Sequence, residues 1–221
     1  MNQTRCNVPP PVTLLLLGAT GAVGSQVLRL AQQDPRIGRV ICPTRRPLPP
    51  HSRVLNPIVD FSALSAEVGW QADAGIGCLG TTLRLAGSTE AFDRIERGYL
   101  ITAATLAHRA GTPTFAYNSS VGADRGARGL YLRTKGRVEA ELSTLGFASL
   151  THVRPSVLDA GPRPDSRPGE RLALAMMKPL AFLLPRRIRP VTTAAVARTL
   201  LEAALAAEPG VKIIESEAIA I

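Results

Sequence analysis

The sequence predicts an α/β protein with a doubly wound, mostly parallel sheet. A continuously apolar run at 12–17 leads into a glycine-rich turn and then into an amphipathic helical pattern, as expected of a central strand buried on both faces. Strand-like and helix-like stretches then alternate as far as Pro155, and this rhythm implies right-handed crossovers. A chain of 221 residues can bury one sizeable core. We therefore expect a single Rossmann-like domain, residues 1–221, with a small helical cover at its C-terminal end.

The expected elements can be placed in chain order. Strands are expected at 12–17, 38–42, 58–60, 74–79, 114–118 and 150–153, and a weaker one at 211–214. Helices are expected to begin near residue 25 and to span about 62–68, 89–110, 129–145, 170–184 and 192–207. Two of them end before a glycine, Gly111 and Gly146, which is common at helix C-termini. Beyond Pro155 the alternation breaks, and residues 155–190 are expected to form a loop and a helix on the substrate side.

The first turn carries three glycines with the spacing G-x-x-G-x-x-G: Gly18, Gly21 and Gly24. In such a turn the first glycine lets the chain leave the strand, the second lets backbone approach a phosphate, and the third lets the helix pack closely. The helix N-terminus offers free N–H groups and a partial positive charge to a pyrophosphate. A turn that only connects strand to helix is the plainer alternative. The strand before it and the helix after it favour a dinucleotide site.

The end of the second strand favours NADP over NAD. Folds that bind NAD usually place an acid there for the ribose 2′-hydroxyl, but this chain has Arg45 and Arg46 and no acid between Pro35 and Val59. Guanidinium groups bind a 2′-phosphate through charge-assisted hydrogen bonds. The alternative is that both arginines are merely solvated.

The strongest catalytic candidates are Ser119 and Ser120 at the end of the fifth strand, with Tyr131 and Lys135 in the following helix. Residues four apart share one helix face, and the crossover brings that face over the strand end. A nearby lysine favours the phenolate and brings the tyrosine pKa toward neutrality. Tyr131 could then exchange a proton with a substrate oxygen that a serine holds, while hydride moves to or from nicotinamide. Ordinary packing of the tyrosine and solvation of the lysine are the alternatives.

Composition excludes several other classes. The net charge of +9 comes from 23 scattered arginines and only three lysines, a bias typical of genome composition, so we expect no specific nucleic-acid partner. A small basic cluster at 186–189 leaves binding to an anionic surface open. No run approaches the roughly 18 apolar residues needed to span a bilayer. Three cysteines without a C-x-x-C pair indicate a reducing cytosol and no zinc or other metal site, so a cytoplasmic location is expected.

The motifs resemble the short-chain dehydrogenase/reductase superfamily in its atypical branch. More narrowly, the chain is similar to the Tat-interacting-protein-type oxidoreductases and their bacterial relatives, and a bacterial protein is expected. The segments that carry the resemblance are 18–24, 45–46, 59–61, 78–82, 119–120, 122–124, 131–141, 154–158 and 166–170. The resemblance implies that Thr20, Gly21, Ala22 and Val23 wrap the pyrophosphate, Asp60 and Phe61 flank the adenine, Leu79 and Gly80 line the ribose, Leu158 faces the nicotinamide, and Arg167 closes over the cofactor. It also implies that Tyr131 is the proton donor or acceptor with Lys135 assisting, and the spacing favours Ser120 over Ser119.

We therefore expect an NADPH-dependent oxidoreductase that moves hydride to or from a small carbonyl or alcohol substrate, as a monomer or homodimer. The alternative is an NADPH-binding regulator or sensor with little turnover, because intact motifs do not prove catalysis. Sugar-nucleotide epimerisation uses the same tyrosine and lysine but needs more chain than follows Pro155. The residues expected around the substrate predict only a partly apolar pocket: Leu83, Leu85, Leu172, Met176 and Met177.

Overall fold

The computed structural model of the protein describes residues 10–159, 187 and 189–219. The strands are β1 (Val12–Leu17), β2 (Ile37–Ile41), β3 (Val54–Leu55), β4 (Ala74–Gly77), β5 (Thr114–Asn118), β6 (Ser149–Arg154), β7 (Leu158–Asp159), β8 (Val191–Thr192) and β9 (Gly210–Glu215). The α-helices are α1 (Ala22–Gln33), α2 (Leu83–Ala86), α3 (Thr89–Asp93), α4 (Tyr99–Arg109), α5 (Leu130–Thr144) and α7 (Thr193–Ala206). A π-helical turn, η2 (Arg94–Gly98), joins α3 to α4, and two short 3-10 turns are η1 (Ala66–Val68) and η5 (Ser216–Ala218).

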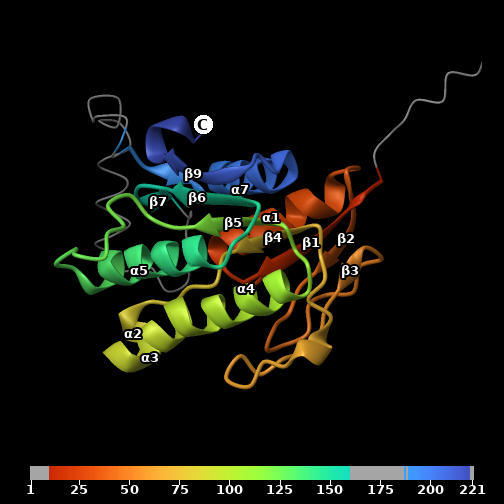
Figure 1. The fold of residues 1–221 in the computed structure, drawn as a ribbon, viewed down its shortest axis with the longest axis horizontal. Coiled ribbons are helices and arrows are strands. Elements are labelled where there is room, and N and C mark those ends of the chain that lie inside the picture. Colours follow the sequence, from red (N-terminus) through yellow and green to blue (C-terminus); the bar gives the residue numbers. More distant parts are fainter. Residues whose placement is uncertain (1–9, 160–186, 188, 220–221) are drawn as a thin grey trace, which may run out of the picture.

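Seven strands form one parallel sheet in the order β3-β2-β1-β4-β5-β6-β9. The chain winds outward from β1 in one direction and then outward from β4 in the other, so the switch point lies between these two strands. Helices cover both faces, with α4 and α5 on one side of the sheet and α7 on the other (Figure 1). This confirms the predicted doubly wound fold. In such a sheet, ligands bind outside the carboxyl ends of the strands at the switch point.

The apolar run of β1 supplies the core on both faces. Leu14 and Leu16 are fully buried in the cluster formed with α1 and α7, whereas Leu15 and Leu17 are fully buried in the cluster on the α4 and α5 face. Successive side chains of a strand point to opposite faces, so a strand without polar alternation must be covered on both. The inference of a central strand from this run is confirmed.

The third strand lies earlier than predicted. Val54 and Leu55 pair with β2, whereas residues 58–60 contribute only an isolated bridge between Ile58 and Thr44. Pro57 has no N–H to donate, although its carbonyl accepts from the Thr44 backbone N–H at 3.1 Å. A two-residue strand is also too short to show periodicity in a sequence.

The helix predicted at 89–110 is confirmed, but it contains the π-helical turn η2 in its middle. Residues 83–86, where the sequence analysis placed no helix, form the short helix α2, and the Thr82 hydroxyl accepts a hydrogen bond from the Leu85 backbone N–H at its start. The expected C-terminal helix at 192–207 and strand at 211–214 are present as α7 and β9. The helix expected at 170–184 lies outside the described residues.

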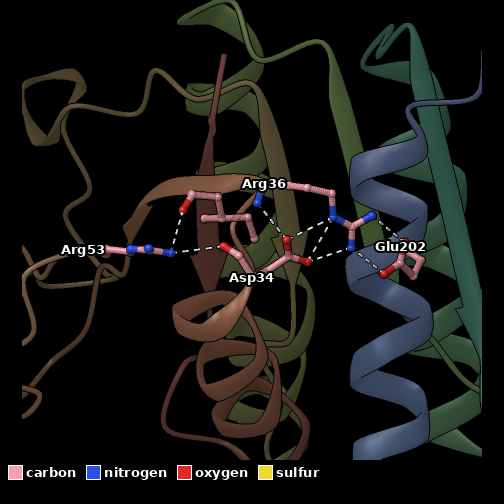
Figure 2. Close-up of polar contacts among 5 residues, drawn as sticks. Asp34, Arg36, Arg53 and Glu202 are labelled. Atoms are coloured by element: carbon pink, nitrogen blue, oxygen red, sulfur yellow. Dashed lines mark hydrogen bonds and ion pairs between the residues drawn. The ribbon is translucent and has the colours of Figure 1, made fainter. Parts of the chain in front are cut away.

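An ion cluster of Asp34, Arg36 and Glu202 joins the amino edge of the sheet to α7 (Figure 2). The Arg36 guanidinium lies 2.7 Å from the Asp34 carboxylate and 2.6 Å from that of Glu202. Its hydrogen bonds hold the pKa of both carboxyls below their usual range. Beside it, Arg53 donates to the backbone carbonyls of Asp34 and Ile37. The cluster therefore ties the α1–β2 connection to a helix far along the chain.

Candidate functional site

The glycine turn after β1 is closed by backbone contacts that leave no space for side chains. Gly18 has a φ of +85°, and a Cβ there would lie 2.5 Å from the Cys78 backbone. A Cβ on Gly24 would lie 2.0 Å from the Gly18 carbonyl oxygen. Gly21 precedes α1, and no side chain in the described part of the molecule caps this helix. The first N–H groups of α1 are therefore available to an anion.

A groove at the carboxyl ends of β1 and β4 consists of two adjoining hollows of about 380 Å³ and 680 Å³. They share Thr20, Gly21, Cys78, Leu79, Gly80, Thr81 and Leu85. The first hollow adds Arg45, Phe61 and Tyr99. The second adds Ala22, Val23, Glu96, Asn118, Tyr131, Lys135 and Leu158. The groove thus runs from the end of β2, past the glycine turn, to the tyrosine and lysine of α5.

Hydrogen bonds from the Asn56 side chain fix the loop that carries Arg45 and Arg46. The Asn56 side chain donates to the Cys42 carbonyl at 2.6 Å and to the Thr44 hydroxyl at 2.8 Å. That hydroxyl in turn donates to the Arg46 carbonyl at 2.6 Å. Both arginine side chains are exposed, and Arg45 lines the first hollow. This loop thus presents the Arg45 side chain at one end of the groove, with the exposed Arg46 next to it in the chain.

Phe61 and Asp60 have different surroundings. Phe61 is buried, lines the first hollow, and has its ring 5.9 Å from that of Tyr99. Asp60 is exposed, and its carboxylate accepts from the backbone N–H and the hydroxyl of Ser62. These hydrogen bonds lower the pKa of Asp60.

Tyr131 and Lys135 lie together at the other end of the groove. Tyr131 is 45% exposed and lies 6.5 Å from Phe92, centroid to centroid. Lys135 is buried, with Nζ 5.7 Å from the centre of the Tyr131 ring. Its Nζ also donates to the Asn118 carbonyl at 3.1 Å. The predicted pair is therefore assembled at the end of β5, as the i, i+4 spacing indicated.

The buried carboxylate of Glu96, which the sequence analysis did not single out, lies against this lysine at 3.1 Å. Burial alone would lower the pKa of Lys135, but the oxygens of Tyr117, Glu96 and Tyr131 outweigh burial and raise it. Lys135 is therefore a fixed cation at neutral pH. The signal for Glu96 was present in the sequence, since it lies four residues from both Phe92 and Leu100 on the buried face of the helix.

The two serines face different environments. The Ser119 hydroxyl is buried and donates to Glu139 at 2.5 Å, and Glu139 is also bound by Arg154 at 2.6 Å. Arg154 reaches Glu215 on β9 at 3.0 Å. Ser120 is half-buried, and within the described residues its hydroxyl makes one contact, with the Val121 carbonyl at 3.4 Å. Ser119 is therefore engaged in a network that joins α5, β6 and β9, whereas the Ser120 hydroxyl is not.

Several predicted residues can be placed only in part. Leu83 and Leu85 are exposed, and Leu85 lines both hollows. Arg167, Leu172, Met176 and Met177 lie outside the described residues.

Cys42 and Cys78 are free thiols, and burial raises the pKa of each to about 12. Within the described ranges, no cluster of three metal-ligating side chains occurs, and no helix has the length and apolar character needed to cross a bilayer.

Comparison with known proteins decides the family. Protein HTATIP2 of Rattus norvegicus is 38% identical over 167 residues, which cover 73% of this chain and 68% of HTATIP2. The chain belongs to the HTATIP2/FMP52 family of atypical short-chain dehydrogenases/reductases. Protein FMP52, mitochondrial, of Candida albicans is 34% identical over 163 residues, 70% of each chain. No family model matches the sequence.

Solved structures agree on the fold of this HTATIP2/FMP52 family member. A nucleoside-diphosphate-sugar epimerase from Agrobacterium tumefaciens superposes with a TM-score of 0.72 over 93% of this chain and 72% of the epimerase, at 16% identity. MoeE5 in complex with UDP-glucuronic acid and NAD superposes with a TM-score of 0.69 over 91% of this chain and 74% of MoeE5, at 17% identity. Family and fold together indicate the NAD(P)-binding fold of short-chain dehydrogenases/reductases.

Two expectations are wrong. The FMP52 relatives from Candida, Debaryomyces and Aspergillus are named as mitochondrial, which contradicts the cytoplasmic location predicted from the cysteines. These relatives and rat HTATIP2 are eukaryotic, which contradicts the bacterial assignment. Reduced thiols report the redox state of a compartment but do not name it, and a resemblance to a family with bacterial members does not identify a kingdom.

Proposed function

We propose that the protein is an NADPH-dependent oxidoreductase that transfers hydride to or from a small carbonyl or alcohol substrate. One observation carries this proposal: Tyr131 and the charged Lys135 line the same groove as the glycine turn and the N-terminus of α1. A groove that joins an anion-binding turn to a positioned phenol suits a dinucleotide cofactor beside an acid–base group.

The residues present fit a nicotinamide dinucleotide. The glycine backbone and the uncapped α1 would hold the pyrophosphate, and Leu79, Gly80 and Leu158 would line the ribose and the ring. The buried Asn118 Oδ1 at this groove has no hydrogen-bond partner among the described residues, so a polar group of a ligand would satisfy it. When bound, the nicotinamide would supply or accept the hydride.

The side chains of the chain itself would move the proton. Tyr131 would give its hydroxyl proton to the substrate oxygen during reduction and take it back during oxidation. The Lys135 ammonium would stabilise the negative charge that the transfer leaves on the Tyr131 oxygen. Ser120 would hold the substrate oxygen, because the Ser119 hydroxyl already serves Glu139. The half-exposed position of Tyr131 leaves it accessible to a small substrate.

The choice of NADPH rests on Arg45 and Arg46. No acid occupies the corresponding loop, and Arg45 lines the opposite end of the groove from Tyr131. A 2′-phosphate there would meet two guanidinium groups, which bind phosphate with forked geometry. MoeE5, which shares the fold, was solved with NAD, so the loop residues of each protein, rather than the fold, would determine which nucleotide it prefers.

Replacement of Tyr131 tests the reaction. Tyr131→Phe should lower kcat for NADPH-dependent reduction of a small carbonyl by at least about 100-fold, the usual size of a general acid–base contribution, while the affinity for NADPH stays within threefold. Tyr99→Phe, at the other end of the groove, is the matched control and should retain kcat. If NADPH binds but no carbonyl in a broad panel is reduced in a Tyr131-dependent way, the protein is a nucleotide-binding regulator instead.

A further inference from the structure

We propose that Glu96 is a positioning residue that keeps Lys135 charged and in place beside Tyr131, and that it ties this lysine to the loop at 79–82. The catalytic meaning of the inference rests on the proposed function, but the charge state of Lys135 can be tested without it. Glu96, Lys135 and Tyr131 would then act together as a group of three residues.

The position of Glu96 is unusual for a carboxylate. It is 2% exposed and lies in the π-helical turn η2, on the same buried face as Phe92 and Leu100. Acidic side chains are rarely buried unless they are paired, because the isolated charge is strongly unfavourable there. π-Helical turns occur frequently at functional sites. Glu96 thus places a carboxylate on a buried helix face whose pattern would otherwise call for an apolar side chain.

The two oxygens of Glu96 serve two different elements. Oε1 accepts a hydrogen bond from the Thr81 backbone N–H at 2.6 Å, and Oε2 lies 3.1 Å from Lys135 Nζ. The loop approaches so closely that a Cβ on Gly80 would lie 3.1 Å from Oε1. Gly80 and Thr81 line both hollows of the groove. One carboxylate therefore joins the floor of the proposed cofactor groove to the proposed catalytic lysine.

The other titratable groups around Lys135 cannot replace this carboxylate at neutral pH. The ring of Tyr117, from β5, lies 5.0 Å from Nζ, and that of Tyr131, from α5, lies 5.7 Å away. Burial raises the pKa of both Tyr117 and the Cys78 thiol, so both remain neutral. Among the groups that face Lys135 in the described structure, Glu96 supplies the carboxylate at ion-pairing distance, 3.1 Å from Nζ. Without it, burial would favour loss of the lysine proton.

The small number of lysines makes a direct test practical. Lysine labelled with ¹³C at Cε should give three NMR signals, and that of Lys135 is the one unaffected by Lys178→Arg or Lys212→Arg. In the wild type it should titrate above the other two. In Glu96→Gln, which keeps the size of the side chain but removes its charge, the midpoint should fall by at least about one pH unit, a tenfold change in protonation.

Glu141→Gln is the matched control, because Glu141 lies on α5 and pairs with the partly exposed Arg97 rather than with Lys135. It should leave the Lys135 midpoint unchanged. An unchanged midpoint in Glu96→Gln would overturn the inference. If that variant does not fold, the wild type decides alone: a Lys135 signal that titrates at or below the ordinary lysine range, near 10.4, would also overturn it.

Activity then separates the two proposals. In Glu96→Gln the pH dependence of kcat for NADPH-dependent reduction should shift, whereas loss of stability alone would reduce the active fraction without moving the profile. Glu96→Asp, which restores the charge on a shorter side chain, should recover much of the wild-type profile. A shifted Lys135 midpoint in a protein without turnover would support the role of Glu96 and reject the proposed function. Turnover that depends on Tyr131, with an unshifted midpoint, would do the reverse.

Discussion

The adjacent serines after β5 should separate stability from catalysis. Ser119→Ala removes a buried hydrogen bond to the Glu139 carboxylate, and loss of a bond to a charged group typically costs about 1.5–3 kcal/mol. Because Arg154 still pairs with Glu139, we expect a decrease in the free energy of unfolding of about 1–2 kcal/mol, measured by urea denaturation. Ser120→Ala should leave stability nearly unchanged and lower kcat about 100-fold, the cost of losing one donor to the reacting oxygen. If instead Ser119→Ala lowers kcat and Ser120→Ala lowers stability, Ser119 is the serine that contacts the substrate.

Two glycines offer a second test with a single-residue change. A Cβ at Gly24 would lie 2.0 Å from the Gly18 carbonyl, so the backbone of the turn must move. Overpacking of this kind costs about 1–3 kcal/mol, and Gly24→Ala should also weaken nucleotide binding. At Gly98 the nearest atom to an added Cβ is 3.9 Å away, in the Arg94 side chain. Gly98→Ala should therefore stabilise the helix by roughly 0.5–1 kcal/mol. Thermal unfolding monitored by circular dichroism measures the stability of both variants. A Gly24→Ala variant as stable as the wild type would contradict the tight turn.

Among the elements, α7 is tied to the α1–β2 connection by the ion cluster of Asp34, Arg36 and Glu202. Arg36 and Glu202 are about half exposed, with 51% and 54% of their side-chain area accessible, so solvent screens the pair and Arg36→Ala should cost only about 0.5–1 kcal/mol at pH 7. Contacts with Arg36 depress the pKa of both carboxyls. Their contribution is therefore complete above the unfolded-state values near 4 and is lost as the pH falls through the lower folded-state values.

Urea denaturation at several pH values measures this contribution. The wild type and Arg36→Ala should differ by a constant amount between pH 5 and 7 and converge below about pH 3. Arg29→Ala is the control for loss of a positive charge, because the exposed Arg29 on α1 contacts Gln26 rather than this cluster. A difference that stays the same down to pH 3 would mean that Arg36 acts through packing of its aliphatic stem rather than through its charge.

At the scale of the whole molecule, the sequence predicted the features that depend on residues close together in the chain. The run at 12–17, the three glycines and the pair Tyr131 and Lys135 each span only a few residues, and the structure places them on the expected strand, turn and helix. Glu96 and Asn56 escaped notice because their partners are distant in sequence and become neighbours only when the crossovers close. Residues 54–55 form a strand only because β2 offers its edge. Pairing of this kind leaves no period in a single sequence.

The nucleotide preference can be measured through the stability of the whole molecule, because a ligand that binds only the native state raises the free energy of unfolding. At a concentration 100 times Kd this contribution is about 2.7 kcal/mol, which raises the Tm of a domain of this size by roughly 5–10 °C. NADPH should give this shift, and NADH at the same concentration should give less than half of it, because it lacks the 2′-phosphate that Arg45 and Arg46 would bind. Replacing both arginines with serine should bring the two shifts together. Replacing the exposed Arg109 and Arg137, away from these loops, changes the net charge equally and should preserve the difference. Equal shifts in the wild type would remove the phosphate-binding role from Arg45 and Arg46.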